Sequence, residues 1–186
     1  MPHITLEDHL HGITGLLEYR QDTAAPIRAL TQLLLRGSSS LSAGERELIA
    51  SLVSSRNQCV FCTTAHSTAA NILLEENMTC ELVKQDYLSA PVSDKMKALL
   101  HIAALTQING KKVTTEVIDA ARDAEATDQE IHDTVLLTGV FCLYNKYVDG
   151  LASVTPADPA YYNKLGERIT TIGYQRLPGG YDHLKK

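Results

Sequence analysis

The chain has 186 residues, of which 44% are hydrophobic and 21% charged, and its formal net charge at pH 7 is −5. This length fits one domain, or one domain with an appended segment, and is enough to bury a core. The acidic balance argues against a nucleic-acid partner, because no basic excess is present to neutralise phosphates. The polar start "MPHITLEDHLHGITG" is neither a secretory signal nor a transit peptide, and the longest apolar runs are too short to span a bilayer. We therefore expect a cytoplasmic protein with no membrane partner.

The first part of the chain carries the signals of two helices, and no run shows the period of two that indicates a strand. A capping box that opens at Thr5 predicts a helix over residues 5–20. A second helix is expected over residues 23–36, with Thr23 as its N-cap and Pro26 within its first turn.

The next segment contains a clearer helix start. Ser42 and Glu45 form an S-x-x-E capping box, and the helix that follows has an apolar stripe of Leu48, Ile49, Leu52 and Val53. Asn57 is expected to cap the following helix, which begins close to Cys59 and runs to about Leu74.

The second half of the chain is also helical in pattern. Shorter helices are expected after Thr79, Ser93 and Thr114. Thr127 and Glu130 open a long apolar helix through Tyr147, and "DPAYYNKLGERITTIG" predicts one more helix before a loop-like segment at 174–186. The sequence therefore predicts an all-α protein, with residues 1–186 forming a single domain.

A weak internal repeat accompanies these helices. Shifting the chain by 83 positions superimposes Glu47 on Glu130, Cys59 on Cys142 and Cys62 on Asn145. One interpretation is a duplicated helical pair that keeps thiol chemistry in its first copy. The other is chance matching of two amphipathic helices.

The stretch "NQCVFCTTAH" carries the chemistry. Four cysteines are too few for a disulfide scaffold, and a CxxC pair in a reducing compartment indicates redox or metal chemistry. Cys59, Cys62 and His66 are spaced i, i+3 and i+7, which puts them on one face of a helix. In the first turn, unpaired N–H groups stabilise a thiolate, so we expect one cysteine with a pKa well below about 8.5. Residues i and i+3, at a Cα separation of roughly 5–6 Å, can form a disulfide.

Polar neighbours supply a route for the proton. His66 lies one turn beyond Cys62 and can take the thiol proton directly or through water. Glu47, on the preceding helix, can orient the imidazole or complete a proton relay.

Two simpler interpretations remain open. The cysteines can be small core residues, or they can form part of a zinc site with Cys80, His101 or Glu47 as the further ligand. The absence of a second CxxC or of an HxxxH in the sequence disfavours zinc, and we expect neither a metal nor a cofactor. Cys80 and Cys142 are expected in the core, whereas Asn145 and Asp149 are expected to make helix-end or interface hydrogen bonds.

These residues resemble a known family. "SAGERELIASLVSSRNQCVFCTTAH" is similar to the signature of the alkylhydroperoxidase D-like group of the carboxymuconolactone decarboxylase superfamily, in which a glutamate, CxxC and a histidine recur at this spacing. Glu47, Cys59, Cys62 and His66 occupy the four positions. "FCLYNKYVDGL" resembles a segment of the peroxidase-related branch, with Lys146 where arginine is usual. The resemblance spans about residues 25–174.

The resemblance implies an all-helical bundle that assembles as homo-oligomers built from dimers and reduces peroxides with thiols. Cys62 is then the nucleophile that attacks a small hydroperoxide, and Cys59 resolves the resulting sulfenic acid as a disulfide. His66 and Glu47 form the proton relay, and a lipoyl- or thioredoxin-type protein restores the dithiol. The other functions weighed are a non-enzymatic redox sensor or interaction protein and a lactone decarboxylase. The decarboxylase is disfavoured because its proton-transfer chemistry needs no CxxC.

One position departs from the family pattern. Well-known members carry a second histidine immediately before the nucleophilic cysteine, whereas this chain has Phe61. One acid/base group is thereby lost, and the residue before Cys62 is apolar.

Overall fold

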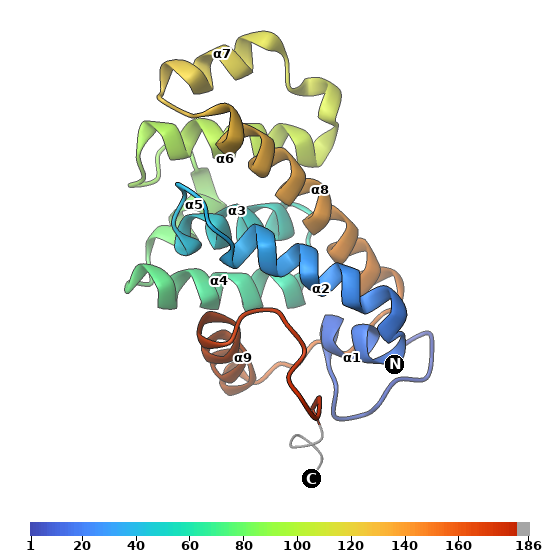
Figure 1. Cartoon of the computed structure of the whole chain (residues 1–186). Helices are drawn as coiled ribbons and strands as arrows, with labels where there is room; N and C mark the ends of the chain where they lie inside the picture. Colours follow the sequence, from blue (N-terminus) through green and yellow to red (C-terminus); the bar gives the residue numbers. More distant parts are fainter. Residues whose placement is uncertain (182–186) are drawn as a thin grey trace.

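The structure is a computed structural model that describes residues 1–181 (Figure 1). These residues form nine α-helices and one short 3-10 helix without any strand, so the all-α prediction is confirmed. No helix in this part of the chain is long and apolar enough to cross a membrane. The helices are α1 (Gly12–Tyr19), α2 (Gln21–Arg36), α3 (Ala43–Arg56), α4 (Val60–Leu74), α5 (Thr79–Asp86), α6 (Asp94–Ile108), η1 (Gly110–Lys112), α7 (Thr115–Asp123), α8 (Asp128–Gly150) and α9 (Pro159–Thr171).

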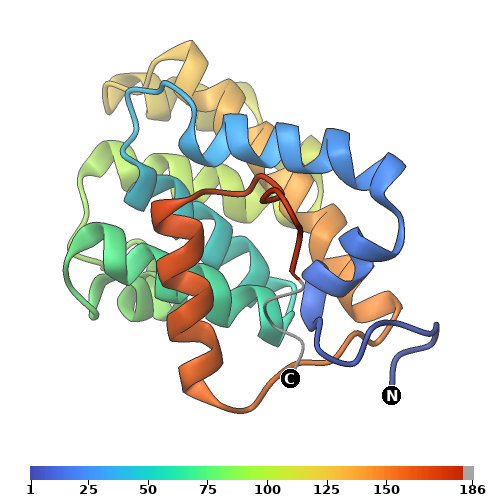
Figure 2. The same ribbon diagram turned by 60° about the horizontal axis from the view of Figure 1, so that its bottom comes forward.

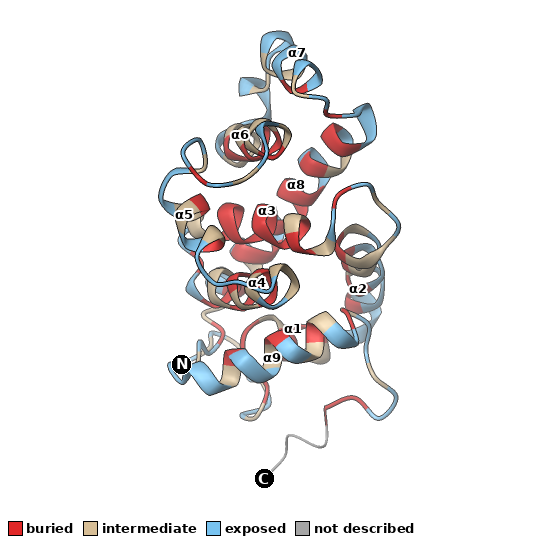
Figure 3. Ribbon diagram, turned by 90° about the vertical axis from the view of Figure 1, so that its left-hand side faces the viewer, coloured by how far each residue is buried: buried red, intermediate tan, exposed pale blue. Residues whose placement is uncertain are grey.

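Helix α3 lies at the centre of the molecule, and Figure 3 shows it almost wholly buried. The predicted apolar stripe is confirmed, because Leu48, Ile49, Leu52 and Val53 are all at most 1% exposed. α3 packs against α4, α5, α6 and α8. Full burial of one such side chain contributes about 1.5–3 kcal/mol. The helix that carries Glu47 is therefore held on several sides by the core.

Both strong capping boxes predicted from the sequence are present. The Ser42 hydroxyl accepts a hydrogen bond from the Glu45 N–H at 3.2 Å, and the Glu45 carboxylate accepts one from the Ser42 N–H at 2.8 Å. Thr127 and Glu130 make the same reciprocal pair at the start of α8. Such caps are typically worth about 1 kcal/mol each. They fix where the two central helices α3 and α8 begin.

The N-terminal helix is shorter than predicted, since α1 begins at Gly12 rather than near Thr5. The backbone before it pairs with the segment after α8: the His3 N–H donates to the Leu151 carbonyl and the Gly12 N–H to the Val154 carbonyl, both at 2.9 Å. The bond from Gly12 takes the place of a hydrogen bond within the predicted helix, and the bond from His3 attaches the start of the chain. Gly12 then has a φ of +56°, a conformation that favours glycine, and the chain turns there into α1.

The start of α2 also differs from the prediction. The helix begins at Gln21, and Thr23 does not cap it, because the Thr23 hydroxyl donates to the Arg20 carbonyl at 3.1 Å. Pro26 therefore lies beyond the first turn. Because proline has no N–H, α2 lacks the hydrogen bond that residue 26 would otherwise donate to the carbonyl four residues earlier.

The duplicated helical unit is not confirmed. The shift of 83 positions superimposes Cys59, which lies at the break between α3 and α4, on Cys142, which lies inside the uninterrupted helix α8. It also superimposes the fully buried Glu47 on Glu130, a residue of a capping box. The matched residues thus have different structural positions.

The C-terminal segment returns from α9 across the molecule toward α1 and α2 (Figure 2). Gly173 adopts a φ of +86°, and a Cβ there would lie 2.3 Å from the Gln32 side-chain oxygen. The next residue, Tyr174, donates its N–H to that oxygen at 2.7 Å. These contacts attach the segment to α2. Residues 182–186 of the expected loop-like segment lie outside the described residues.

Candidate active site

A tight turn between α3 and α4 positions the two cysteines. α3 ends in a Schellman motif, in which the Gln58 N–H bonds the Ser55 carbonyl at 2.9 Å and the Cys59 N–H bonds the Ser54 carbonyl at 3.1 Å. Gln58 has a φ of +61°, in the left-handed region that this motif uses. Cys59 is then the N-cap of α4, so Asn57 does not cap that helix as the sequence predicted but is the C-cap of α3.

Cys62 lies in the first turn of α4, as predicted, and Cys59 immediately precedes the helix. Both are buried, with 3% and 0% exposure, and both are free thiols. The side-chain hydrogen bond with Cys59, together with burial and repulsion between the two sulfurs, raises the pKa of Cys62 well above its usual value. The expectation of a lowered pKa is therefore wrong for Cys62 in the dithiol. Two buried sulfurs that share one proton disfavour the loss of that proton, because a second negative charge would then lie beside the first. This effect outweighs the stabilisation of a thiolate by the start of the helix.

Glu47 and His66 meet beside the dithiol, as the sequence predicted. His66 Nδ1 lies 2.6 Å from Glu47 Oε2, across the contact between α3 and α4. The carboxyl group is fully buried, and burial alone would raise its pKa. The interactions with His66, Arg36 and Tyr174 outweigh burial, so the pKa of Glu47 lies below its usual value. An ionised carboxylate accepts the hydrogen bond, and His66 Nδ1–H donates it.

Two further residues hold the Glu47 carboxylate. Arg36 donates to its Oε1 at 2.7 Å, and the Tyr174 hydroxyl donates to the same oxygen at 2.6 Å. Burial and the adjacent charge of Glu47 raise the pKa of Tyr174 well above its usual value, so the phenol stays a donor. Neither residue could be predicted from the sequence pattern. Arg36 is an ordinary last-turn cation of α2, and Tyr174 follows α9 in a segment with no helical pattern.

Cys62 and His66 line the same cavity, which has a volume of about 60 Å³. No direct hydrogen bond joins their side chains among the described contacts. As residues i and i+4 of α4, they have Cβ atoms roughly 5–6 Å apart. The rest of the wall comes from α1, α2, α8, α9 and the segment after α9. Glu47 lies behind His66 and does not line the cavity.

Phe61 fills the position where a histidine is usual in the family. It is 2% exposed and packs against Tyr161 and Tyr162, with ring centroids 6.3 and 5.9 Å away. A Cβ at Gly12 would lie 2.1 Å from its ring. Phe61 thus contributes an apolar contact between α4, α9 and the start of α1.

Asn145 of α8 lies on another side of Cys62. A hydrogen bond with Asn145 lowers the pKa of Cys62, against the larger effects of Cys59 and burial, whereas the charge of Asp149 raises it. Asn145 is itself fixed, because it accepts from Asn57 at 2.8 Å and donates to the Ser54 hydroxyl at 3.1 Å. The predicted hydrogen-bonding role of Asn145 is confirmed. Its hydrogen bond with Cys62 was not predicted from the sequence.

The remaining cysteines and the suggested zinc ligand lie elsewhere. The Cys80 thiol donates to the Ser51 hydroxyl at 3.3 Å in the core, and the partly buried Cys142 accepts from Asn57 at 3.5 Å. His101 pairs with the Tyr87 hydroxyl at 2.9 Å. Among residues 1–181, no group of three or more His, Cys, Asp or Glu side chains is arranged to hold a metal.

Known structures share this architecture, although no family model matches the chain and no curated protein matches it significantly. An uncharacterized peroxidase-related protein from Silicibacter sp. TM1040 has a TM-score of 0.74 and 26% identity, over 81% of this chain and 78% of that chain. An uncharacterized peroxidase-related protein from Ralstonia eutropha JMP134, with an alkylhydroperoxidase AhpD core, has a TM-score of 0.74 and 24% identity, over 82% and 78%. A protein of unknown function from Agrobacterium tumefaciens has a TM-score of 0.67 and 20% identity, over 77% and 97%.

The fold is therefore that of the alkylhydroperoxidase D-like superfamily, as the signature residues predicted. Within this superfamily, the structure is similar to that of a peroxidase-related protein.

Proposed function

We propose that the chain is a thiol-dependent peroxidase that reduces organic hydroperoxides. The observation that carries the proposal is the shared cavity of Cys62 and His66, with the buried Glu47 fixing the imidazole from behind. A nucleophile, a general base and a group that orients the base are the parts that activated-nucleophile chemistry requires. Similarity to peroxidase-related proteins supports the same reaction class.

In this proposal, His66 Nε2 takes the proton of Cys62, and Glu47 stabilises the imidazolium that forms. The Cys62 thiolate attacks the terminal oxygen of the hydroperoxide, and the O–O bond breaks. Its electron pair leaves on the alkoxide oxygen, which receives the proton from His66 to give the alcohol. Cys62 becomes a sulfenic acid.

Cys59 then completes the cycle. Its sulfur attacks the sulfenic sulfur of Cys62, and the hydroxyl leaves as water with the Cys59 proton. The product is a Cys59–Cys62 disulfide. A dithiol donor of lipoyl or thioredoxin type returns two electrons and two protons to the pair. We further propose a homo-oligomer built from dimers, because α8 exposes Leu136 and Leu143 to 38% and 52% along one face.

The test is steady-state consumption of a panel of hydroperoxides with dihydrolipoyl and thioredoxin-type donors, together with thiol counting. One equivalent of peroxide should remove two thiols, and the loss should persist in a Cys80→Ser, Cys142→Ser protein. Cys59→Ser should trap a sulfenic acid on Cys62, detectable by dimedone labelling and mass spectrometry. Stoichiometric oxidation without turnover by any donor would instead indicate a redox sensor. Dimedone labelling of Cys59 in the Cys62→Ser protein would mean that Cys59 is the nucleophile and Cys62 the resolving cysteine.

A further inference from the structure

The cavity beside Cys62 adjoins a larger one. The second cavity has a volume of about 360 Å³ and lies between the N-terminal segment, α1, α9 and the C-terminal segment. The two cavities share Thr14, Leu165 and Arg168 in their walls. They are therefore adjacent, and we call the one at the dithiol the inner chamber and the one between the two terminal segments the outer chamber.

The volumes of the two cavities differ, and this difference bears on where each part of an organic hydroperoxide can lie. The inner chamber has a volume of about 60 Å³, against about 360 Å³ for the outer one. The larger space is therefore the one away from Cys62. The outer chamber offers more room for the body of an organic hydroperoxide, and it has apolar walls of Leu10, Leu165, Ile172 and Leu177.

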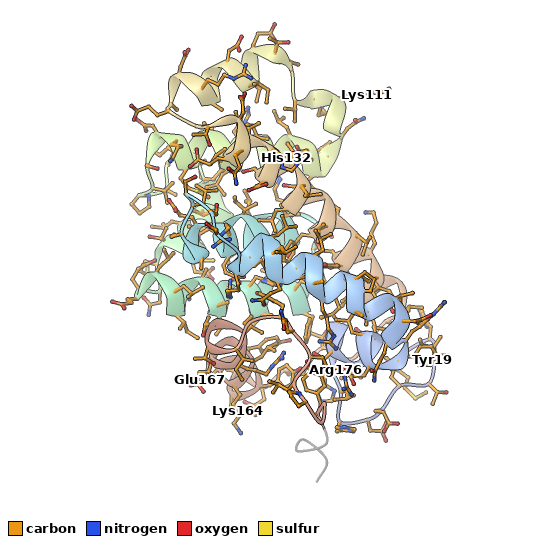
Figure 4. All side chains as sticks on the ribbon, in the orientation of Figure 1. Tyr19, Lys111, His132, Lys164, Glu167 and Arg176 are labelled. Atoms are coloured by element: carbon orange, nitrogen blue, oxygen red, sulfur yellow. The ribbon has the colours of Figure 1, made fainter. Side chains whose placement is uncertain are left out.

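The charged side chains that line the two chambers are all cationic. Arg28 and Arg168 line the inner chamber, and Arg168 and Lys164 line the outer one. No Asp or Glu is among the described residues that line either chamber, although the whole chain carries a net charge of −5. Figure 4 places Lys164 on α9, at the end of the molecule where the outer chamber lies.

The two arginines differ in whether a carboxylate of the protein already pairs with them. Arg28 pairs with Glu18 at 2.8 Å. Arg168 makes no ion pair within residues 1–181, and its guanidinium lies over the Tyr181 ring and donates to the Tyr181 hydroxyl at 3.1 Å. His11 Nδ1 is buried in the outer chamber wall without a hydrogen-bond partner in the described structure. The outer chamber thus combines an unpaired guanidinium and an unsatisfied polar atom with apolar walls.

We propose that the substrate is a hydroperoxide with an apolar chain and a terminal carboxylate. Its carboxylate pairs with Arg168 and Lys164, its chain lies along the apolar wall, and its hydroperoxyl group reaches Cys62 in the inner chamber. Arginine is suited to this role because its planar guanidinium binds a carboxylate through two parallel hydrogen bonds. The proposal rests on the peroxidase function above and adds the substrate class.

The kinetic test compares 8-hydroperoxyoctanoate with its methyl ester, which has the same chain without the charge. The wild-type protein should prefer the acid. In Arg168→Met, the ratio of kcat/KM for acid over ester should fall roughly 10- to 100-fold, the range expected when a charge-assisted hydrogen bond is lost. Arg168→Lys should recover part of the ratio, and Lys164→Gln should lower it by a smaller factor.

Matched controls are available at the far end of the molecule. Arg122→Met on α7 removes an exposed arginine paired with Asp119 and Asp128. Lys111→Gln removes a lysine that Figure 4 shows at the end opposite Lys164. Neither control should change the ratio. An equal preference for acid and ester in the wild-type protein, or a ratio that both Arg168→Met and Lys164→Gln leave unchanged, would overturn the proposal.

A binding measurement separates this inference from the peroxidase function. Octanoate, which cannot be reduced, should bind the wild-type protein more tightly than octanol in calorimetry, and Arg168→Met should remove the difference. If octanoate binds in this way while no hydroperoxide is consumed, the carboxylate site stands and the peroxidase function fails. If hydroperoxides are consumed but octanoate and octanol bind equally, the peroxidase function stands and the carboxylate site fails.

Discussion

Glu47 and His66 lie on neighbouring helices and are joined by a hydrogen bond of 2.6 Å between two buried side chains. Because His66 Nδ1–H donates to the carboxylate, Nε2 is the nitrogen left to exchange a proton. Arg36 and Tyr174 occupy the other carboxylate oxygen, so Glu47 cannot rotate away without losing three partners. The imidazole next to Cys62 thus has a fixed tautomer and orientation.

Two substitutions beside Cys62 should shift its pKa in opposite directions. Cys59 is the main cause of the raised pKa of Cys62, whereas Asn145 lowers that pKa. Cys59→Ala should therefore move the pH midpoint of Cys62 alkylation downward, and Asn145→Ala should move it upward. The measurement is the rate of iodoacetamide labelling of Cys62 against pH, followed by mass spectrometry. Cys80→Ala is the control and should leave the midpoint in place. Two shifts in the same direction would contradict the assignment.

The acid stability of the fold should depend on Glu130. Burial alone would raise its pKa, but hydrogen bonds from Lys95, Thr127 and Ser40 lower it from 4.5 to about 2. The stabilisation of the folded state is therefore complete above pH 4.5 and is lost as the pH falls through about 2. A shift of this size corresponds to about 3 kcal/mol in the free energy of unfolding.

Urea denaturation of wild-type and Glu130→Gln proteins at several pH values tests this relationship. At pH 7 the variant should be less stable, and the difference should shrink as the pH approaches 2. Glu45→Gln, at the equivalent position of the other capping box, is the control. Glu45 is more exposed than Glu130 and makes no ion pair within residues 1–181, so its replacement should cost less. A constant difference across all pH values would rule out ionisation of Glu130 as the cause.

Adding a single methyl group at Gly12, where the backbone contacts Phe61, should lower the stability of the protein. A Cβ at Gly12 would lie 2.1 Å from the Phe61 ring, and the φ of +56° disfavours any other residue. Gly12→Ala should therefore lower the free energy of unfolding by about 1–3 kcal/mol, and it should also slow the reaction of the adjacent Cys62. A Cβ at Gly139, inside α8, would meet no side chain or other helix of the described structure within 4 Å, so Gly139→Ala should instead stabilise the protein by up to about 1 kcal/mol. Thermal or urea unfolding measures both. Equal effects of the two substitutions would mean that the Phe61 contact is unimportant.

The part of the site that could be predicted from the sequence is the part built by local geometry. Cys62 and His66 lie one turn apart on α4, and Cys59 is its N-cap, so their spacing in the sequence was enough to bring them to the same end of one helix. Glu47 came from the family resemblance, and the buried contact between α3 and α4 brings it to His66. Capping boxes at Ser42 and Thr127 were equally local and are present as predicted.

The errors have a common physical origin in tertiary contacts. Tyr174 reaches Glu47 from 127 positions further along the chain, and no local pattern encodes that approach. The pKa of Cys62 depends on burial and on the position of the Cys59 sulfur, neither of which a helix-dipole argument includes. The early start predicted at Thr5 is wrong, because the Val154 carbonyl accepts the N–H of Gly12, whose φ of +56° lies outside the right-handed helical region.

The proton relay gives the most discriminating prediction. If His66 is the general base for Cys62, His66→Ala should slow peroxide attack by about 10²–10⁴, the usual contribution of general-base catalysis. Glu47→Gln should slow it by the same factor or less, because the imidazole keeps its nitrogen but loses its anionic partner. The double variant should be little slower than His66→Ala, since the two groups serve one proton transfer. Stopped-flow rates of peroxide reduction against pH measure all four proteins.

The matched control for Glu47 is Glu130, another almost fully buried carboxylate that makes an ion pair. Glu130→Gln should lower stability without changing the rate of peroxide attack, because Glu130 lines neither cavity near the dithiol and contacts Lys95, Ser40 and Thr127 instead. If Glu130→Gln slows the reaction as much as Glu47→Gln, the rate loss reflects a weakened fold and not a relay. If the pH–rate curves of wild-type and His66→Ala proteins superimpose, His66 contributes packing against Phe141 and Tyr174 only, and the dithiol reacts without a general base.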